Sequence, residues 1–562
     1  MNEDRTANIN LLKKSINLIN QNKIKEAEKI LIGLSKFKDF QVDTFLYLGI
    51  CNIKKKENEK AIEFLKRSLK LNPDHEYANL NLGLVYFSNK NLDISLKYIK
   101  KSLDINNKNQ LAIYHFGLIN LALRKYDEAE KYFLKLLEIN SKDSNALLNL
   151  GIIYNKTNNR TKSVEMYEKL IKINPNNIYA YNNLGLTYFD NLNFYKAIEC
   201  YENCIEIDPN FISAYGNLGR TYLELRNFDK ALLNFNKVEK INPTDYNNLF
   251  AIGKTYLSME KYDEGFRYYE YRKYLNNKEA IRYVKKNYNS DELDTYEIVN
   301  KKILILSEQG FGDTIQFSRY LDFLKKNNEI IFLINKKLNF LFKNSNLKLI
   351  NNLEEIPEHD YFQNLLSLPK IYYESKKSFV NNINYIKTDK DTDSKWSQRL
   401  KNINKLKIGI FWQGNKNYYG DDKRSIPLHE FEKIIKNNKY SIISLQKNLG
   451  VEQIKQNNYE KYILDYSLEI DNDEDAYKDS ISILRNLDLV ITSDSSIAHL
   501  AATMNINTWI ALSYNPDWRW YIENKKSVFY NTIKIFQQKK PGNWQSVFDE
   551  INSALLKYKS SL

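Results

Sequence analysis

Small and large residues recur every 34 positions through the first half of the chain. The clearest column is a series of glycines at Gly49, Gly83, Gly117, Gly151, Gly185, Gly219 and Gly253. A small residue follows each glycine by twelve positions, and a large one follows it by sixteen: Leu65, Ile99, Phe133, Tyr167, Tyr201, Phe235 and Tyr269. Small residues allow two helices to approach closely, and large ones fill the space beside them. The pattern therefore predicts an array of similar helical hairpins.

The period and its columns resemble the tetratricopeptide repeat (TPR), whose unit is a helix, a turn and a second helix. Ala27 extends the pattern upstream, so seven to eight repeats are expected over residues 8–275. Arrays of this kind form superhelices with a long concave face.

A column of asparagines predicts what this face binds. Its members stand two residues before column glycines: Asn81, Asn149, Asn183 and Asn217. An amide both donates and accepts hydrogen bonds, so such a column can hold an extended peptide by its backbone. The column is interrupted at Tyr47, His115 and Ala251. We therefore expect a protein or peptide partner on the concave face, held through this ladder of amides.

The pattern changes after a polar, charged stretch at residues 276–300, which is predicted to be a joining helix or linker. From Lys301 short apolar, β-branched runs alternate with helical stretches, which predicts parallel sheets covered by helices. The predicted strands are Ile303–Leu306, Ile330–Leu333, Ile408–Trp412, Ser441–Leu445, Leu487–Thr492 and Thr508–Leu512. The predicted helices include Thr314–Lys325, Ala476–Leu487 and Ser496–Met504.

The alternation forms two blocks, residues 301–390 and 405–562. The fold class expected is α + α/β, with an N-terminal TPR α-solenoid followed by two Rossmann-like lobes. Ligands in such sheets bind beyond the carboxyl ends of the strands, so the turns after the strands are where chemistry is expected.

Composition and charge narrow the classes of function. A chain of 562 residues exceeds one hydrophobic core, so two or more domains are expected. The formal net charge of +14 comes from lysines scattered among glutamates. No dense basic block is present, which leaves nucleic-acid binding as the weakest alternative. No run approaches the ~20 apolar residues of a membrane helix, and the first residues do not resemble a signal peptide, so the cytoplasm is expected.

The turn after the first predicted strand contains Gly310, Gly312 and Asp313. Two glycines let the backbone come close to a ligand. Asp313 lies near a helix start, where it either caps the helix or protrudes as a general base. The two roles do not exclude each other.

The turn after the first strand of the second block contains a group of polar residues and a basic pair: Gln413, Gly414, Asn415, Lys423 and Arg424. The guanidinium of Arg424 suits phosphate oxygens, although the pair could also be exposed loop charges. A late strand is followed by the third turn, with Asp494, Ser495, Ser496 and His499. Free N–H groups at a helix start and serine hydroxyls favour an anion. Asp494 is expected to hold the loop, and His499 is either a hydrogen-bonded core residue or a catalytic one.

The fourth turn contains Trp518, Arg519 and Trp520. Aromatic rings and an arginine favour stacking on a sugar or a base. Anchoring of the lobe by these rings is the equal alternative.

The Gly-Phe-Gly-Asp run ending at Asp313 and the Ser-Asp-Ser-Ser-Ile-Ala-His run ending at His499 resemble the ADP-heptose:lipopolysaccharide heptosyltransferases. These are GT-B enzymes with two Rossmann-like lobes and no required metal. Repeats followed by a GT-B module also resemble the O-linked N-acetylglucosamine transferases. With its Asp-Lys-Arg-Ser-Ile-Pro and Trp-Arg-Trp motifs, the chain resembles bacterial tetratricopeptide-repeat glycosyltransferases.

The resemblance implies a metal-independent glycosyltransferase that uses a nucleoside diphosphate sugar and no cofactor. It gives Asp313 the role of catalytic base and places Ser495 and Ser496 at the donor diphosphate. Arg424 matches a basic position more loosely, and Lys423 could serve instead. The first lobe is short, and the first-lobe histidine of the N-acetylglucosamine enzymes is missing. The Asp-x-Asp spacing in Asp471–Asp475 is interpreted as a helix cap. The alternative function is a non-catalytic TPR scaffold with a degenerate transferase domain.

Overall fold

The computed structural model describes residues 2–276, 278–381, 385–415, 420–471, 474–520 and 527–558. The chain divides into two compact units, Met1–Phe211 and Ile212–Leu562.

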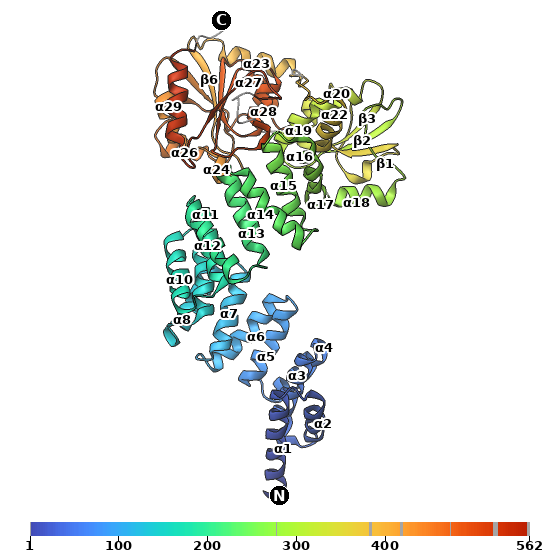
Figure 1. Cartoon of the computed structure of the whole chain (residues 1–562), viewed down its shortest axis with the longest axis vertical. Helices are drawn as coiled ribbons and strands as arrows, with labels where there is room; N and C mark the ends of the chain where they lie inside the picture. Colours follow the sequence, from blue (N-terminus) through green and yellow to red (C-terminus); the bar gives the residue numbers. More distant parts are fainter. Residues whose placement is uncertain are drawn as a thin grey trace. The chain divides into compact units, whose positions relative to one another are not determined.

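The first unit consists of helices joined in pairs, as expected for the repeats (Figure 1). Its helices are α1 (Asn2–Asn20), α2 (Ile24–Leu34), η1 (Lys38–Phe40), α3 (Gln41–Lys54), α4 (Asn58–Leu71), α5 (Glu76–Ser88), α6 (Leu92–Ile105), α7 (Gln110–Ala122), α8 (Tyr126–Ile139), α9 (Ser144–Lys156), α10 (Arg160–Ile173), α11 (Ile178–Asp190) and α12 (Phe194–Ile207). The glycine column works as predicted, since a Cβ on Gly185 would lie 2.6 Å from the ring of Tyr201.

The second unit begins with two more hairpins of the same kind. Its first helices are α13 (Ile212–Glu224), α14 (Phe228–Ile241), α15 (Tyr246–Ser258), α16 (Tyr262–Tyr269), η2 (Glu270–Arg272), α17 (Lys273–Asn276) and α18 (Lys278–Asn287). The last repeats therefore belong to the same compact unit as the sheets that follow them.

The first sheet has five parallel strands in the order β1-β5-β2-β3-β4. The strands are β1 (Asp291–Glu292), β2 (Lys302–Leu306), β3 (Glu329–Leu333), β4 (Lys348–Ile350) and β5 (Tyr361–Asn364). Its helical segments are α19 (Phe311–Phe317), η3 (Ser318–Tyr320), α20 (Leu321–Leu324), η4 (Lys336–Leu338), α21 (Asn339–Phe342), η5 (Leu353–Glu355), η6 (Leu365–Ser367) and α22 (Leu368–Lys376).

The second sheet has six parallel strands in the order β11-β10-β9-β6-β7-β8. The strands are β6 (Leu406–Phe411), β7 (Tyr440–Ser444), β8 (Ile463–Leu464), β9 (Leu489–Ser493), β10 (Thr508–Leu512) and β11 (Ile533–Gln537). Its helical segments are α23 (Lys390–Leu400), α24 (Asp421–Arg424), η7 (Leu428–Phe431), α25 (Glu432–Ile435), α26 (Glu452–Gln456), α27 (Lys478–Leu484), α28 (Ser496–Thr503), η8 (Trp518–Trp520) and α29 (Trp544–Leu555).

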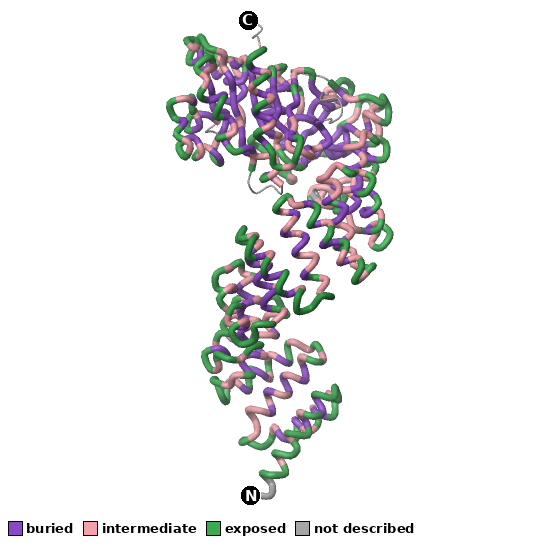
Figure 2. The backbone as a smooth tube through the Cα atoms, turned by 60° about the vertical axis from the view of Figure 1, so that its left-hand side comes forward, coloured by how far each residue is buried: buried purple, intermediate pink, exposed green. Residues whose placement is uncertain are grey.

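Alternate residues of the strands face different helices. In the second sheet Ile491 packs with Phe548 of α29, whereas its neighbour Val490 belongs to the cluster that contains Ala501 of α28. Successive side chains of a strand point to opposite faces, so helices cover both sides of this sheet. Figure 2 shows the buried residues of the second unit gathered in its strands, with exposed residues at the loops.

The segment 276–300, predicted to be a joining helix or linker, contains helix α18 and also takes part in the first sheet. Val284 of α18 is fully buried against Leu304 and Leu306, and Asp291–Glu292 pairs with β5 as an edge strand. The periodicity could not show this, because β1 is two charged residues long and is held by backbone hydrogen bonds from its neighbour.

The sequence prediction of a helical TPR solenoid followed by parallel sheets with helices is confirmed at this level. Among the described residues, none of the helices combines the length and apolar character needed to cross a membrane.

Candidate functional site

The turn between β2 and α19 presents Asp313 from the first sheet. Gly310 is the residue before the helix, and its backbone N–H donates to Asp313 Oδ2 at 3.0 Å. Asp313 is therefore the third residue of the helix rather than the cap itself, and its carboxylate satisfies one of the N–H groups at the helix start.

The second oxygen of Asp313 contacts the fourth predicted turn. Arg519 of η8 donates from Nη2 to Asp313 Oδ1 at 2.7 Å and from Nη1 to Asp517 Oδ1 at 2.7 Å. Arg519 is 8% exposed, so the guanidinium bridges the two carboxylates in a largely water-free place. A residue of the second block thus holds the candidate base of the first.

The first and third predicted turns touch each other. A Cβ on Gly312 would lie 3.1 Å from the ring of His499 and 3.4 Å from Cα of Ser496. A side chain at this position would be tightly packed against the start of α28, so glycine eases the close approach of α19. The turn that follows β2 of the first sheet and the turn that follows β9 of the second are therefore brought together.

The third predicted turn includes a serine turn, residues 492–496, in which the hydroxyls of Ser495 and Ser496 form hydrogen bonds within the protein. The hydroxyl of Ser495 shares a hydrogen bond of 3.0 Å with that of Thr492, and Tyr477 donates to Ser496 Oγ at 2.7 Å. Neither serine side chain caps its own helix.

Two titratable groups of this turn are shifted in opposite senses. Burial raises the pKa of Asp494 to about 6, with Asp517 adding to the rise and Arg424 opposing it. Burial, followed by the charges of Arg519, Arg319 and Arg424, holds the pKa of His499 well below its usual value. The imidazole is therefore neutral. It stacks on Trp520 at 4.8 Å, and its Nδ1 is 3.0 Å from the hydroxyl of Tyr530.

The second predicted turn is held by its own polar contacts. Gln413 is buried and accepts from Gln453 at 2.8 Å. A Cβ on Gly414 would overlap Asp421 and lie 2.9 Å from Nη2 of Arg424, so the glycine makes room for that ion pair. Asn415 adjoins residues 416–419, which lie outside the described part of the chain.

The basic pair of this turn is divided between two partners. Arg424 pairs with Asp421 at 3.0 Å, and Lys423 pairs with Glu224 of α13 at 2.7 Å. The charge of Arg424 nevertheless acts on the pKa of both Asp494 and His499. The guanidinium therefore lies near the serine turn, while the lysine contacts the repeats.

The tryptophans of the fourth turn are buried. Trp518 is 6% exposed and meets the rings of Phe266 and Tyr269 edge-on at 6.0 and 5.9 Å. Trp520 is 1% exposed beneath His499. Both rings anchor η8 to the protein, and stacking on a sugar stays a prediction.

Four residues of the site were missed by the sequence analysis: Tyr269, Arg272, Glu308 and Lys254. Arg272 is fully buried and donates to Glu308 at 2.8 Å. Burial lowers the pKa of Lys254, against the charges of Asp517 and Glu224. A signal for Lys254 was present in the repeats: the residue after the column glycine is apolar at Ile50, Leu84, Leu118, Ile152 and Leu186 but basic at Arg220 and Lys254.

The predicted asparagine ladder makes hydrogen bonds within the chain. Asn81 and Asn149 donate to carbonyls one helical turn earlier, and Asn183 accepts from Asn182 at 3.3 Å. Asn217 lies in the other unit and accepts from Arg220 at 2.9 Å. Peptide binding through these amides stays a prediction.

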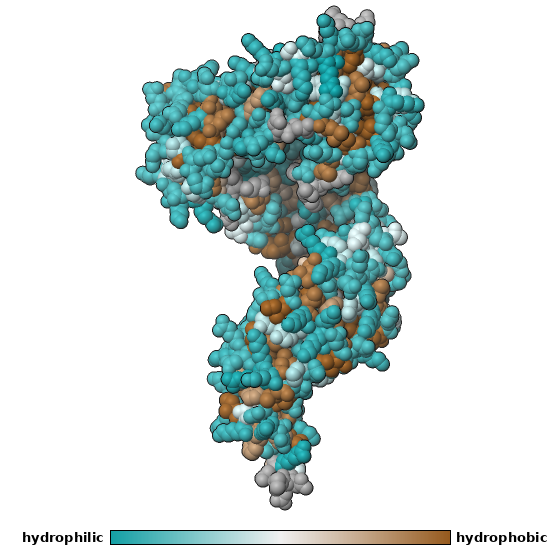
Figure 3. Space-filling view, turned by 180° about the vertical axis from the view of Figure 1, so that it is seen from behind, coloured by the Kyte–Doolittle hydropathy of each residue, from teal (hydrophilic) through white to brown (hydrophobic). Residues whose placement is uncertain are grey.

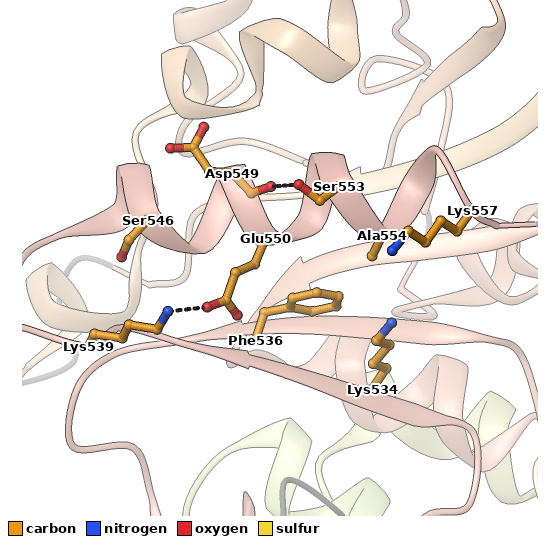
Figure 4. A pocket seen from close by; sticks show the side chains of 9 residues that line it. All are labelled: Lys534, Phe536, Lys539, Ser546, Asp549, Glu550, Ser553, Ala554 and Lys557. Carbon is orange, nitrogen blue, oxygen red and sulfur yellow. Dashed lines mark hydrogen bonds and ion pairs between the residues drawn. The ribbon is translucent and has the colours of Figure 1, made fainter.

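Two hollows lie away from these turns. One of about 620 Å³ lies between β11 and α29, where Lys539 pairs with Glu550 at 2.7 Å beside Phe536 (Figure 4). Another of about 380 Å³ is bordered by Tyr256 and Tyr268. Neither contains a predicted site residue. On the face drawn in Figure 3, hydrophobic residues form scattered patches in a mostly hydrophilic surface.

In the Asp-x-Asp stretch, Asp471 bonds to the start of a helix, and residues 472–473 lie outside the described part of the chain. Asp471 accepts from the backbone N–H groups of Asp479 at 2.7 Å and Ser480 at 3.2 Å, at the start of α27. Within the described ranges there is no group of three or more His, Cys, Asp or Glu side chains arranged to hold a metal ion.

Comparison with known families identifies the repeats. The tetratricopeptide repeat family matches residues 178–211 and 200–232, and the TPR repeat family matches 153–191. The family of anaphase-promoting complex, cyclosome, subunit 3 matches residues 54–136. The chain therefore contains TPR repeats.

Several solved structures are similar to part of the chain. A tetratricopeptide repeat protein from Parabacteroides merdae is 20% identical with a TM-score of 0.37, covering 44% of this chain and 99% of that one. YrrB, a TPR protein with an unusual peptide-binding site, is 22% identical with a TM-score of 0.29, covering 34% and 98%. A thermophilic TPR protein in Thermus thermophilus is 17% identical with a TM-score of 0.29, covering 33% and 100%. Among curated proteins, none matches this sequence.

Proposed function

We propose that the chain is a GT-B glycosyltransferase that moves a sugar from a nucleoside diphosphate sugar to an acceptor selected by the repeats. In this proposal the two parallel sheets are Rossmann-like lobes, the first for the acceptor and the second for the donor. One observation carries the proposal: the turn of Asp313 meets the serine turn of α28 at Gly312. A carboxylate and a helix start are thereby brought together at the carboxyl ends of β2 and β9.

The proposed reaction uses these groups in distinct roles. The donor diphosphate lies near the start of α28, where backbone N–H groups favour an anion. Arg424 offsets the charge that develops on the leaving nucleotide. The acceptor oxygen forms a bond to the anomeric carbon as the bond to the diphosphate breaks. The diphosphate leaves with the electron pair, and Asp313 takes the proton of the acceptor hydroxyl.

The second candidate function is that of a scaffold for protein partners. TPR repeats are present, and every family match falls within residues 54–232. Both carboxylate oxygens of Asp313 are also engaged by the protein. A scaffold would bind partners through its repeats and would neither bind nor turn over nucleotide sugars.

The first experiment is a screen of the purified full chain against nucleotide sugars, with mass-spectrometric detection of hydrolysis, transfer and retained ligand. Asp313→Asn is then compared with the parent protein. The amide still accepts a hydrogen bond at the helix start but cannot take up the proton. We expect sugar transfer to fall about 10²–10⁴-fold, with nucleotide affinity changed by no more than a few fold. Full turnover by this variant would remove Asp313 from the mechanism, and a screen without any nucleotide binding would favour the scaffold.

A further inference from the structure

The last hairpin of the array reaches the candidate base through Arg519. Tyr269 is the final residue of α16, and its hydroxyl accepts from Nη2 of Arg519 at 3.2 Å. The same nitrogen donates to Asp313. Tyr269 is 2% exposed, and burial raises its pKa to about 12, so the phenol is neutral. The neutral phenol oxygen accepts a hydrogen bond that orients the guanidinium of Arg519. Because the phenol carries no negative charge, it does not weaken the ion pair between Arg519 and Asp313.

The hydroxyl of Tyr269 is not explained by packing of the repeat. At Phe133 and Phe235 the ring fills the space beside the column glycine, and phenylalanine suffices for this. At Gly253 the nearest atoms are instead backbone atoms of Tyr268 and Tyr269, and the ring of Tyr269 packs against Phe250 and Trp518. The hydroxyl is an addition that contacts Arg519.

A second contact links the same hairpin to the Asp313 turn. Arg272 lies over the ring of Tyr269, with 4.8 Å between its Cζ and the ring centroid, and it pairs with Glu308 at 2.8 Å. Glu308 precedes the glycines of the turn, and its Oε1 also accepts from the backbone of Leu366. Arg272 thus contacts Glu308 before the glycines, and Tyr269 reaches Asp313 after them only through Arg519.

We propose that the last TPR hairpin is a working part of the sugar-transfer site, in which Tyr269, acting through Arg519, is a positioning residue for the carboxylate of Asp313. This inference rests on the proposed function. A base must be held close to the geometry of the reaction, and a misplacement of about 1 Å costs on the order of 10²-fold in rate. The repeats then do more than select an acceptor, because their final turn sets where the proton is taken up.

The test compares two single-oxygen deletions in the full chain. Tyr269→Phe keeps the ring and removes the hydroxyl that contacts Arg519. Tyr201→Phe, at the same column position in the first unit, is the matched control. Hydrogen–deuterium exchange is measured for the backbone of residues 307–317. We expect exchange there to be at least about threefold faster in Tyr269→Phe and unchanged in Tyr201→Phe. Equal exchange in the two variants would overturn the positioning role.

Kinetics then separate positioning from simple loss of structure. With the donor identified by the screen, kcat for transfer should fall about tenfold in Tyr269→Phe while KM for the donor stays within about twofold. An unchanged kcat would also overturn the inference. If the parent protein binds neither UDP, ADP nor GDP and turns over no nucleotide sugar, the proposed function fails. The exchange measurement would still decide whether Tyr269 orders the turn.

Discussion

At the scale of single residues, burial of charged side chains sets the pKa values in the site. Asp494 follows β9 and is partly buried beside Asp517, Arg424 and Arg519. Burial acts most strongly on it and raises its pKa to about 6. The folded protein therefore holds the proton of Asp494 more tightly than the unfolded chain does. Between about pH 4 and pH 6 the folded state binds more protons, so stability falls as the pH rises through this window.

Replacing Asp494 with asparagine should remove this penalty. At pH 7.5 we expect Asp494→Asn to raise the free energy of unfolding by about 1–3 kcal/mol, because each pKa unit corresponds to about 1.4 kcal/mol. The gain should shrink as the pH falls through about 6 and vanish near pH 4, where the aspartate is also neutral. Chemical denaturation at several pH values measures this. Asp422→Asn changes an exposed acid of the same unit and serves as the control. A destabilised Asp494→Asn at pH 7.5 would show that neighbouring cations compensate the charge.

At the scale of the element, a repeat helix needs glycine at the column position but tolerates substitution of a glycine elsewhere in the same helix. Helix α13 contains both kinds. A Cβ on Gly219 would lie 2.6 Å from the ring of Phe235, which is 1% exposed and cannot move aside. A Cβ on Gly216 would find its nearest atom, from Val238, at 4.0 Å. The column position is therefore set by packing, whereas Gly216 is only a weak helix residue.

The two glycines should respond to alanine with opposite signs. Gly216→Ala should raise the free energy of unfolding by about 0.5–1 kcal/mol, because alanine loses less backbone entropy in a helix. Gly219→Ala reduces the backbone entropy lost on folding by the same amount. It also overfills the core, so it should lower the free energy of unfolding by about 1–3 kcal/mol. Denaturation of the full chain under identical conditions measures both. Equal effects of the two substitutions would mean that the helices separate freely at Gly219.

Among the strands, the apolar pattern predicted some elements and missed others. The strands that are buried on both faces, such as Ile303–Leu306 and Thr508–Leu512, are apolar except for Thr508 and were predicted to within a residue. The strands Tyr361–Asn364 and Ile463–Leu464 were missed, because one is half polar and the other is two residues long. Backbone hydrogen bonds with a neighbouring strand stabilise these two strands, and such bonds leave no mark on the pattern of apolar residues.

At the scale of the molecule, the sequence predicted which turns carry the candidate residues but not which turns meet or how they are held. Gly312 follows β2 of the first sheet and Ser496 follows β9 of the second, so their contact joins two sheets, and the pattern of strands does not predict it. The pairs Arg519–Asp313 and Arg272–Glu308 join residues 206 and 36 positions apart in the chain. A pattern of single positions contains no information about such partners. The repeat period likewise predicted a boundary near residue 275, whereas compactness places the last two hairpins with the sheets.

The core explains why these hairpins belong with the sheets. Leu257, Phe266 and Tyr269 are each no more than 2% exposed, and they share one hydrophobic cluster with Ile303 of the first sheet and Val490 of the second. Removing them would expose apolar surface in both sheets at once. It would also take Arg272 away from Glu308, and an unpaired buried charge costs about 3–5 kcal/mol.

Two truncated chains test where the second unit begins. The fragment 212–562 keeps α13 to α18 and should unfold in a single cooperative transition, as a compact unit does. The fragment 276–562 starts at the predicted linker and lacks Leu257, Phe266, Tyr269 and Arg272. We expect it to aggregate or to expose hydrophobic surface to a fluorescent dye. The lost burial and the unpaired Glu308 together cost a large part of the free energy of unfolding of a typical domain, which is about 5–15 kcal/mol. Circular dichroism melts and dye binding compare the two. If the fragment 276–562 melts cooperatively at the same temperature as 212–562, the hairpins are dispensable to the fold and the boundary predicted from the period is the physical one.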